Sequence, residues 1–164
     1  MLKIVKATLF VLLLITFGSL TSVNAESNEI FDVPVSQKSD QWKVELGEVN
    51  YNSKEIKEAR PKKGENFEMY SLKITNIGND VHNAEFETYR DDPNSPTKFG
   101  LSLQDEVKGI FKQGRDVKFA NMPIYVKANE FEVVISWHGD PVTLKDGTVD
   151  EGREFKETFT FKRK

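Results

Sequence analysis

The chain carries two histidines, and His138 lies in a Trp-His-Gly-Asp-Pro run with Asp140 two residues later. An imidazole and a carboxylate at the end of a strand are both possible ligands for a metal ion. Two ligands are too few for a closed site, and His82 is the only other imidazole in the chain. We therefore interpret His138 as a polar turn residue that points away from the core, and we predict neither a metal site nor a cofactor.

A second group of oxygen ligands lies in the acidic loop predicted at residues 91–95, which begins with Asp91 and Asp92. Asp80 or Asp105 would add a further carboxylate. Calcium takes six to eight oxygens, but the spacing here lacks the alternating ligands, central glycine and terminal glutamate of an EF-hand. The favoured interpretation is a solvated acidic loop, and calcium binding is the alternative.

Catalytic constellations are hard to assemble from these residues. Strand parity places Glu85 and Glu87 on one face, and paired carboxylates hydrolyse glycosides at defined separations. Neighbouring acids on an exposed sheet face are far commoner, and the chain has no Gly-x-Ser-x-Gly elbow, phosphate loop or dinucleotide fingerprint. We predict that the protein is not an enzyme, with an unrecognised hydrolase as a third-ranked alternative.

Four aromatic residues bear on binding: Trp42, Tyr89, Phe111 and Tyr125. If they lie outside the core, they form a patch for a protein or carbohydrate partner, since large exposed apolar patches mark interaction sites. The favoured interpretation is that they fill the second sheet face or cover loops. The sequence does not determine which sheet face is wet.

Length and composition define the class of protein that must position these residues. The 164 residues allow one domain, with 38% hydrophobic and 30% charged residues in a globular balance. The net charge of −3 gives no basis for a nucleic-acid-binding surface. The absence of cysteine excludes a disulfide scaffold, a thiol nucleophile and a lipid-modified N-terminal cysteine.

The N-terminus predicts export. Lys3 and Lys6 precede an apolar run over residues 7–20, and Val23 and Ala25 suit the small-residue positions of a cleavage site before Glu26. The alternative is an uncleaved membrane anchor, but the run is shorter than the about 20 apolar residues that span a bilayer. Residues 1–25 are therefore a predicted signal peptide, and the secreted chain, with a net charge of −5, keeps no stable membrane anchor.

The rest of the chain predicts strands. Residues 26–41 form a polar leader that is either flexible or an edge strand, and residues 42–164 form the domain. Apolar and polar residues alternate over seven or eight segments: 42–46 with a continuation near 49–51, 70–75, 84–89, 99–103, 117–126, 131–137 and 155–161. This pattern predicts an all-β, antiparallel sandwich with a core made of Trp42, Leu72, Ile74, Phe86, Leu103, Phe119, Val133, Ile135, Trp137 and Phe159.

The connections carry further predictions. Gly47 suggests a β-bulge, residues 76–80 a tight hairpin, and residues 105–109 and 145–148 turns. Two prolines make residues 91–96 a loop, and Pro123 marks a sheet edge or a break. The charged connection over residues 52–66 is a solvated loop, with one helical turn over residues 54–60 as the alternative.

Several short motifs resemble a class of small exported immunoglobulin-like domains of Gram-positive bacteria, mostly of unknown function. The motifs cover about half of the chain: Gly64 with Phe67, residues 72–78, residues 103–105 with Gly109, and residues 114–119, 122–124 and 131–135. The resemblance implies an immunoglobulin-like sandwich and an exported location. Many relatives begin with a lipid-anchored cysteine, and its absence here implies release from the cell.

These observations predict a secreted, non-enzymatic β-sandwich module that binds a protein or a cell-envelope component and no nucleic acid. A weaker resemblance to small bacterial proteinase-inhibitor sandwiches gives the alternative. In that case an exposed loop such as residues 91–98 would inhibit a protease.

Overall fold

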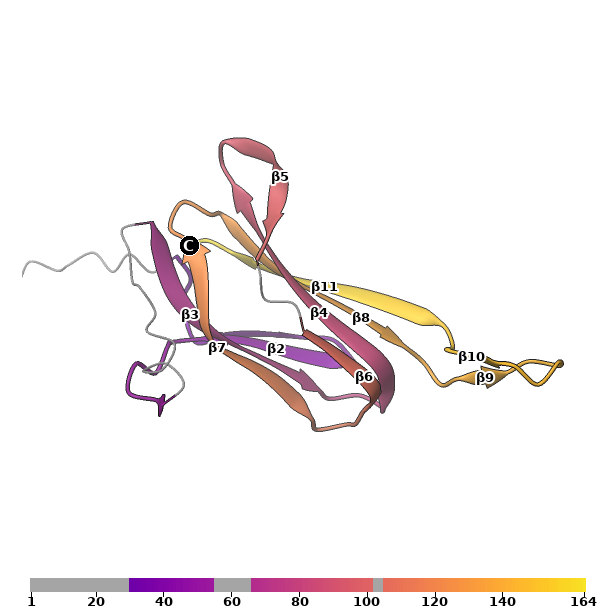
Figure 1. Ribbon diagram of the computed structural model, residues 1–164. Helices are drawn as coiled ribbons and strands as arrows, with labels where there is room; N and C mark the ends of the chain where they lie inside the picture. The colour runs from indigo at the N-terminus through magenta and orange to yellow at the C-terminus, as the bar shows by residue number, and fades with distance from the viewer. Residues whose placement is uncertain (1–29, 55–65, 102–104) are drawn as a thin grey trace, which may run out of the picture.

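The computed structural model describes residues 30–54, 66–101 and 105–164 (Figure 1). Alternating β-branched and aromatic residues form most of its strands, as expected for side chains that pack on a pleated surface. Within these ranges the strands are β1 (Val35–Lys38), β2 (Trp42–Gly47), β3 (Phe67–Asn76), β4 (Val81–Asp92), β5 (Ser95–Gly100), β6 (Asp105–Phe111), β7 (Asp116–Tyr125), β8 (Glu130–His138), β9 (Val142–Thr143), β10 (Val149–Asp150) and β11 (Glu154–Lys162).

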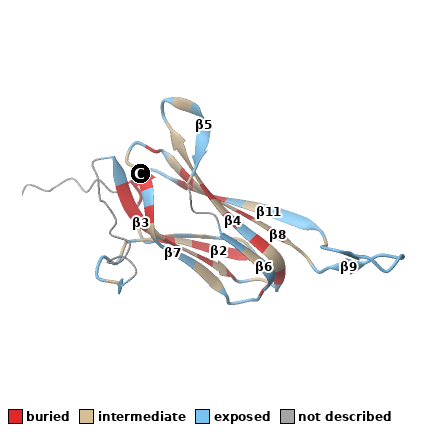
Figure 2. Cartoon of the chain, viewed as in Figure 1, coloured by how far each residue is buried: buried red, intermediate tan, exposed pale blue. Residues whose placement is uncertain are grey.

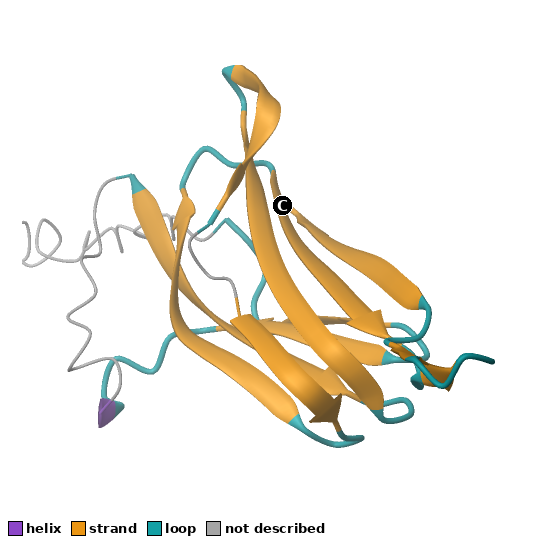
Figure 3. Ribbon diagram, turned by 45° about the vertical axis from the view of Figure 1, so that its right-hand side comes forward, coloured by secondary structure: helices purple, strands orange, loops and turns teal. Residues whose placement is uncertain are grey.

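The strands form two facing antiparallel sheets and one small hairpin (Figure 3). The first sheet has the order β1-β2-β3-β7, and the second has the order β11-β8-β4, after which β4 pairs with both β5 and β6. Strands β2, β3 and β7 facing β11, β8 and β4 reproduce the A-B-E and G-F-C order of an immunoglobulin-like sandwich. The predicted fold class is confirmed. The eleven described strands outnumber the seven or eight expected, because β1 and β6 lie in segments predicted as a leader and a turn, and because β9 and β10 are too short to show a period.

The core lies between the two sheets and is rich in aromatic residues. Trp42 is fully buried, and its ring centroid lies 5.6–5.7 Å from those of Phe86, Phe111 and Trp137. The predicted core residues that are buried are Trp42, Leu72, Ile74, Phe86, Val133, Ile135, Trp137 and Phe159. Phe119 is only partly buried against this cluster, and Leu103 lies outside the described residues.

The first described residues also belong to the core. Ile30 and Phe31 are buried, and their N–H groups donate to the Tyr70 hydroxyl over 2.8 and 3.3 Å. Strand β1 then pairs with β2, so the edge strand was the right alternative for this part of the predicted leader. The predicted signal peptide and the possible helical turn at residues 54–60 fall largely or wholly outside the described ranges.

Four local predictions were wrong because strand pairing is decided by distant residues. Residues 76–80 do not form a tight hairpin but carry the chain from β3 in one sheet to β4 in the other. Strand β2 simply ends at Gly47, and the irregular register lies between Tyr70 and Leu72 of β3. Residues 105–109 belong to strand β6, and residues 91–96 form the end of β4, a turn and the start of β5 rather than a loop.

The crossing between the sheets is fixed by a buried amide. The Asn76 side chain is fully buried, and its Nδ2 donates to the carbonyls of Asn79 (2.8 Å) and Phe111 (3.0 Å). Its Oδ1 accepts from Gln41 Nε2 (2.7 Å) and from Gly78 N (3.1 Å). These bonds satisfy the amide, which removes the penalty of burying it and joins four segments at one end of the sandwich.

The outer strands of the two sheets meet along one side. Gln37 Nε2 of β1 donates to the carbonyl of Thr160 in β11 over 2.6 Å. The backbone N–H of Lys164 donates to the Ile30 carbonyl, and its ammonium pairs with Asp32. The ends of the described chain therefore lie together. In the described part of the chain, no helix is long and apolar enough to cross a membrane.

Candidate functional site

The β9–β10 hairpin projects beyond the end of the sandwich (Figure 1). Its two strands pair only with each other, with Val149 opposite Thr143 and Asp150 opposite Val142. The tip is closed by hydrogen bonds from Leu144 N to Thr148 O (2.8 Å) and from Gly147 N to Leu144 O (3.0 Å). The turn predicted at residues 145–148 is confirmed, and it closes a hairpin that stands apart from both sheets.

A carboxylate organises this tip. Asp146 Oδ1 accepts hydrogen bonds from the Thr148 hydroxyl (2.7 Å) and from the Thr148 N–H (3.0 Å). The hydroxyl bond first, and the backbone bond second, lower the pKa of Asp146 below its ordinary value of 3.8. The turn is therefore defined by its own residues.

Figure 2 shows the β9–β10 hairpin in the colour of exposed residues, and three of these residues are aliphatic. Val142, Leu144 and Val149 are 53%, 48% and 69% exposed. The surrounding segment, residues 140–154, contains five acidic residues and two basic ones: Asp140, Asp146, Asp150, Glu151, Glu154, Lys145 and Arg153. We call Val142, Leu144 and Val149 the exposed aliphatic residues of the hairpin; Val142 and Leu144 lie on one side of it, and Val149, which pairs with Thr143, lies on the other. The carboxylates of residues 140–154 give them an acidic surround.

The root of the hairpin is joined firmly to the core. Trp137 is buried against Trp42, and Phe155 stacks on its other side at 5.6 Å with an interplanar angle of 17°. Gly139 N donates to Arg153 O over 2.9 Å. Gly152 has a φ of +87°, and a Cβ there would lie 2.4 Å from the Asp140 carbonyl oxygen, so only glycine fits.

Both histidines lie at this root. His82 of β4 and His138 of β8 are directly opposite each other in the register, and the outward orientation predicted for His138 agrees with the alternating burial of β8. His82 Nε2 lies 3.6 Å from Asp140 Oδ1, and His138 Nε2 lies 3.8 Å from Glu151 Oε2. The structure therefore places Asp140 beside His82, and it places Glu151 beside His138.

A shallow hollow of about 320 Å³ adjoins His138 and is lined by Asn83, Glu85, Glu106, Lys108, His138 and Glu151. Among the described residues, no group of three or more histidine, cysteine, aspartate or glutamate side chains is placed to hold a metal ion. Metal binding by His138 and Asp140 remains an untested alternative.

The other two candidate ligands, Asp91 and Asp92, lie at the opposite end of the molecule. Asp91 Oδ1 accepts from the N–H groups of Asn129 (2.7 Å) and Glu130 (2.8 Å), and its Oδ2 accepts from Asn129 Nδ2 (3.1 Å). Asp92 Oδ1 accepts from Asn94 N over 2.9 Å. These oxygens hold the β4–β5 hairpin together and attach it to the turn before β8.

Arg90 provides a second attachment for the β4–β5 hairpin. Its guanidinium lies 5.1 Å from the Phe99 ring centroid and 5.0 Å from that of Tyr125. Such contacts stabilise a cation between aromatic faces. The segment predicted as an inhibitor loop, residues 91–98, is therefore a paired hairpin with Pro93 and Asn94 at its turn, and inhibition remains an untested alternative.

An aromatic surface patch was the alternative for four residues, and the favoured interpretation, that they are packed in the domain, is right for two of them. Trp42 and Phe111 are fully buried because both pack in the central cluster, whereas Tyr89 and Tyr125 are partly exposed. The Tyr89 hydroxyl donates to Glu87 Oε1 over 2.9 Å. This bond is the main cause, and desolvation the second, of a pKa of Tyr89 raised above its ordinary value of 10.0.

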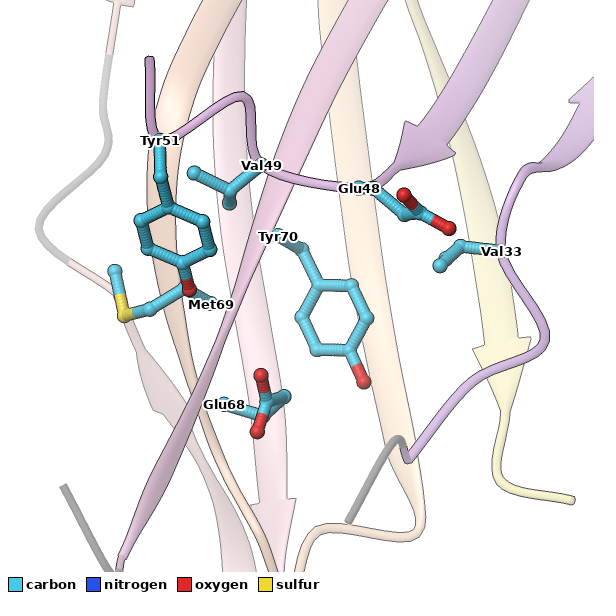
Figure 4. A pocket seen from close by; sticks show the side chains of 7 residues that line it. All are labelled: Val33, Glu48, Val49, Tyr51, Glu68, Met69 and Tyr70. Atoms are coloured by element: carbon cyan, nitrogen blue, oxygen red, sulfur yellow. The ribbon is translucent and has the colours of Figure 1, made fainter. Parts of the chain in front are cut away.

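Another hollow, of about 220 Å³, lies beside β3 (Figure 4). Its lining comes from three segments. These are β3, with Glu68, Met69 and Tyr70, the segment after β2, with Glu48, Val49 and Tyr51, and Val33. The Tyr70 hydroxyl accepts the N–H groups of Ile30 and Phe31. The phenol therefore holds the N-terminal segment against β3.

Sequence reasoning missed three features of this site: the exposure of the aliphatic residues, the position of His82 opposite His138, and the contact of Glu151 with His138. The turn at residues 145–148 and the spacing of Val142 and Leu144 were visible signals for a hairpin. Nothing local indicates that Val142 and Leu144 face solvent, or that His82 lies opposite a residue 56 positions later in the chain.

Comparisons with known proteins agree with this architecture and location. No solved structure matches the chain. The chain is 35% identical to Uncharacterized protein YozF from Bacillus subtilis (strain 168), over 95% of this chain and 96% of that relative. The model of the YozF-like secreted protein family matches residues 25–164, which supports the predicted secretion and Gram-positive origin. The chain therefore belongs to the YozF-like secreted protein family.

Proposed function

We propose that this secreted protein is a non-enzymatic binding module and that the β9–β10 hairpin recognises a protein partner. The observation that supports the proposal is the set of exposed aliphatic residues, Val142, Leu144 and Val149, which an ordered turn holds in solvent outside the folded core. Removing apolar surface from water contributes about 25 cal/mol per Å². A hairpin whose shape is already defined loses little conformational entropy on binding.

The acidic surround of the hairpin defines the chemistry of the partner. With five carboxylates and two basic side chains in residues 140–154, a complementary surface is an apolar depression rimmed by lysine and arginine. The chain as a whole is also acidic, which disfavours anionic envelope polymers as the ligand. These charges favour a protein partner over an anionic envelope polymer.

The non-enzymatic part of the proposal is supported by the surroundings of the candidate acid–base pair. Glu85 is exposed on the outer face of β4, and Glu87 Oε1 accepts the Tyr89 hydroxyl. Glycosidases hold their general acid in an enclosed pocket, whereas Glu85 lies on an open sheet face. The pair therefore fits a surface role better than a catalytic one.

Photo-crosslinking in the producing cells tests the proposal. A photoreactive amino acid is placed at Leu144, and a matched control is placed at Thr97, which is exposed on the other projecting hairpin. We expect a crosslinked product with a second protein from position 144, lost when Val142 and Val149 are changed to serine. Equal products from both positions, or a product formed only between two copies of this chain, would contradict the proposal.

A further inference from the structure

The two legs of the β9–β10 hairpin each carry one carboxylate that faces a histidine. We propose that protonation of His82 and His138 fastens both legs to the β4–β8 sheet, so that the hairpin becomes more ordered, and binds its partner more tightly, as the pH falls. The effect on binding rests on the proposed function. The fastening itself is a property of the secreted protein alone.

The geometry gives one contact to each leg. Asp140 lies in the connection from β8 to β9 and faces His82 at 3.6 Å, and Glu151 lies between β10 and β11 and faces His138 at 3.8 Å. Both distances are too long for a good hydrogen bond, so the attraction depends on the imidazoles being charged. These contacts add to the Gly139–Arg153 hydrogen bond at the root, and one contact on each leg restrains the hairpin from both sides.

The histidines and their carboxylate partners differ in exposure. The side chains of His82 and His138 are 19% and 25% exposed, whereas those of Asp140 and Glu151 are 96% and 72% exposed. His138 Nδ1 is buried with no hydrogen-bond partner among the described residues, which leaves Nε2 as the atom that contacts the hairpin. The sheet therefore presents two held imidazoles, and the hairpin brings two carboxylates whose positions the charged imidazoles would fix.

Other charged groups face this root from each neighbouring element. Glu85 of β4, Glu106 and Lys108 of β6 and Glu151 line the hollow beside His138, Glu154 of β11 is opposite His138 in the register, and Arg153 lies over Phe155. With neutral imidazoles, carboxylates outnumber cations here and repel one another. Two imidazolium ions offset that repulsion and draw the legs in, and the separate carboxylate beside each one reduces the repulsion between these two cross-strand neighbours.

Amide hydrogen exchange followed by NMR tests the fastening in the mature secreted protein. Protection factors are compared between about pH 5.5 and pH 7.5, because histidine is the side chain that acts as a charge switch in this range. Two exposed ion pairs predict a rise of about twofold to fivefold in the protection of the Leu144 and Gly147 amides at the lower pH. The Leu101 amide, which donates to Thr88 O beside the other hairpin, is the internal control.

The matched variant is His82→Gln with His138→Gln, which keeps polar side chains but cannot become charged in this range. We expect the pH dependence to vanish in the double variant and to be halved in Asp140→Asn or Glu151→Gln. A wild-type hairpin without pH dependence, or a dependence that survives the double variant, would overturn the fastening. Because no partner is present, these results are independent of the crosslinking test.

Discussion

Two hairpins project from opposite ends of the sandwich, and they are built in opposite ways. The β4–β5 hairpin is attached to the domain by Asp91, which accepts three hydrogen bonds from residues 129–130, and by Arg90 between two aromatic rings. The β9–β10 hairpin pairs only with itself and turns its aliphatic side chains to water. The first hairpin packs on the rest of the domain, whereas the second is attached to the domain only at its root.

This difference separates the residues that stabilise the domain from those that are free for recognition. Side chains that hold a hairpin down contribute to the free energy of unfolding and are poor contacts for a partner. Side chains beyond the core can change with little effect on folding, and elements that carry function are often of this kind. The predictions below test that separation.

The largest effect is expected where the projecting hairpin joins the core. Trp137→Ala removes a buried indole that packs on Trp42 and Phe155, and we expect the free energy of unfolding to fall by about 3–5 kcal/mol. Denaturant melts measure this loss. Val149→Ala is the control, with a change within about 0.5 kcal/mol. A loss below about 1 kcal/mol for Trp137→Ala would show that the core does not extend to the hairpin root.

A smaller loss is expected at the attachment of the other hairpin. Asp91→Asn removes the charge that accepts hydrogen bonds from Asn129 and Glu130, which should lower the free energy of unfolding by about 1–2 kcal/mol. The matched variant is Asp146→Asn, which changes the same group in the self-contained hairpin and should leave global unfolding unchanged. If both variants reduced stability equally, the contrast between the hairpins would be lost.

Substitution of the exposed aliphatic residues should weaken partner binding without lowering the stability of the domain. Changing Val142, Leu144 and Val149 to serine should alter the free energy of unfolding by no more than about 0.5 kcal/mol for each site, because all three are exposed. The same triple variant should abolish the partner crosslink from a probe placed at Lys145. Thermal melts and crosslinking on one preparation provide both readouts. A marked drop in melting temperature would argue that these three side chains pack on the domain.

The smallest effect is local and depends on acid. Because the pKa of Asp146 is lowered in the folded hairpin, its bonds to Thr148 are fully present above pH 3.8 and are lost as the pH falls through a value below it. The Thr148 amide signal should shift in that range while the amides of β8 do not. Thr148→Ala should bring the titration back towards the ordinary value, and a titration unchanged by that variant would refute the hydrogen-bond explanation.

Much of the sandwich could be predicted because burial in a sheet has a period of two residues. In strand β8 apolar residues recur at every second position of the sequence, and the structure shows buried and partly exposed positions in the same alternation. The buried ones are Phe131, Val133, Ile135 and Trp137. Of the two alternatives at Pro123, a sheet edge or a break, the edge is right, since β7 is the outer strand of its sheet. Residues 76–80 show where this ends, because local turn chemistry does not say which sheet the next strand joins.

The candidate site was less predictable because its parts come from distant positions. His82 and His138 are neighbours only because β4 pairs with β8, and Asp91 finds its hydrogen bonds 38 residues away at Asn129. A carboxylate that reads as a possible calcium ligand in the sequence is thus a structural acceptor. The 145–148 turn was visible, but the exposure of its flanking aliphatic side chains depends on where the sandwich ends.

The hydrogen bond between Lys164 N and the Ile30 carbonyl has a consequence for protein engineering. Because the two ends of the described chain touch, a short linker can join them, and new ends can be opened between Asp146 and Gly147 without breaking a strand of either main sheet. Such a circular permutant would present two free ends where the native molecule presents a closed loop. It would convert the hairpin into two separate arms while leaving the interior of the domain intact.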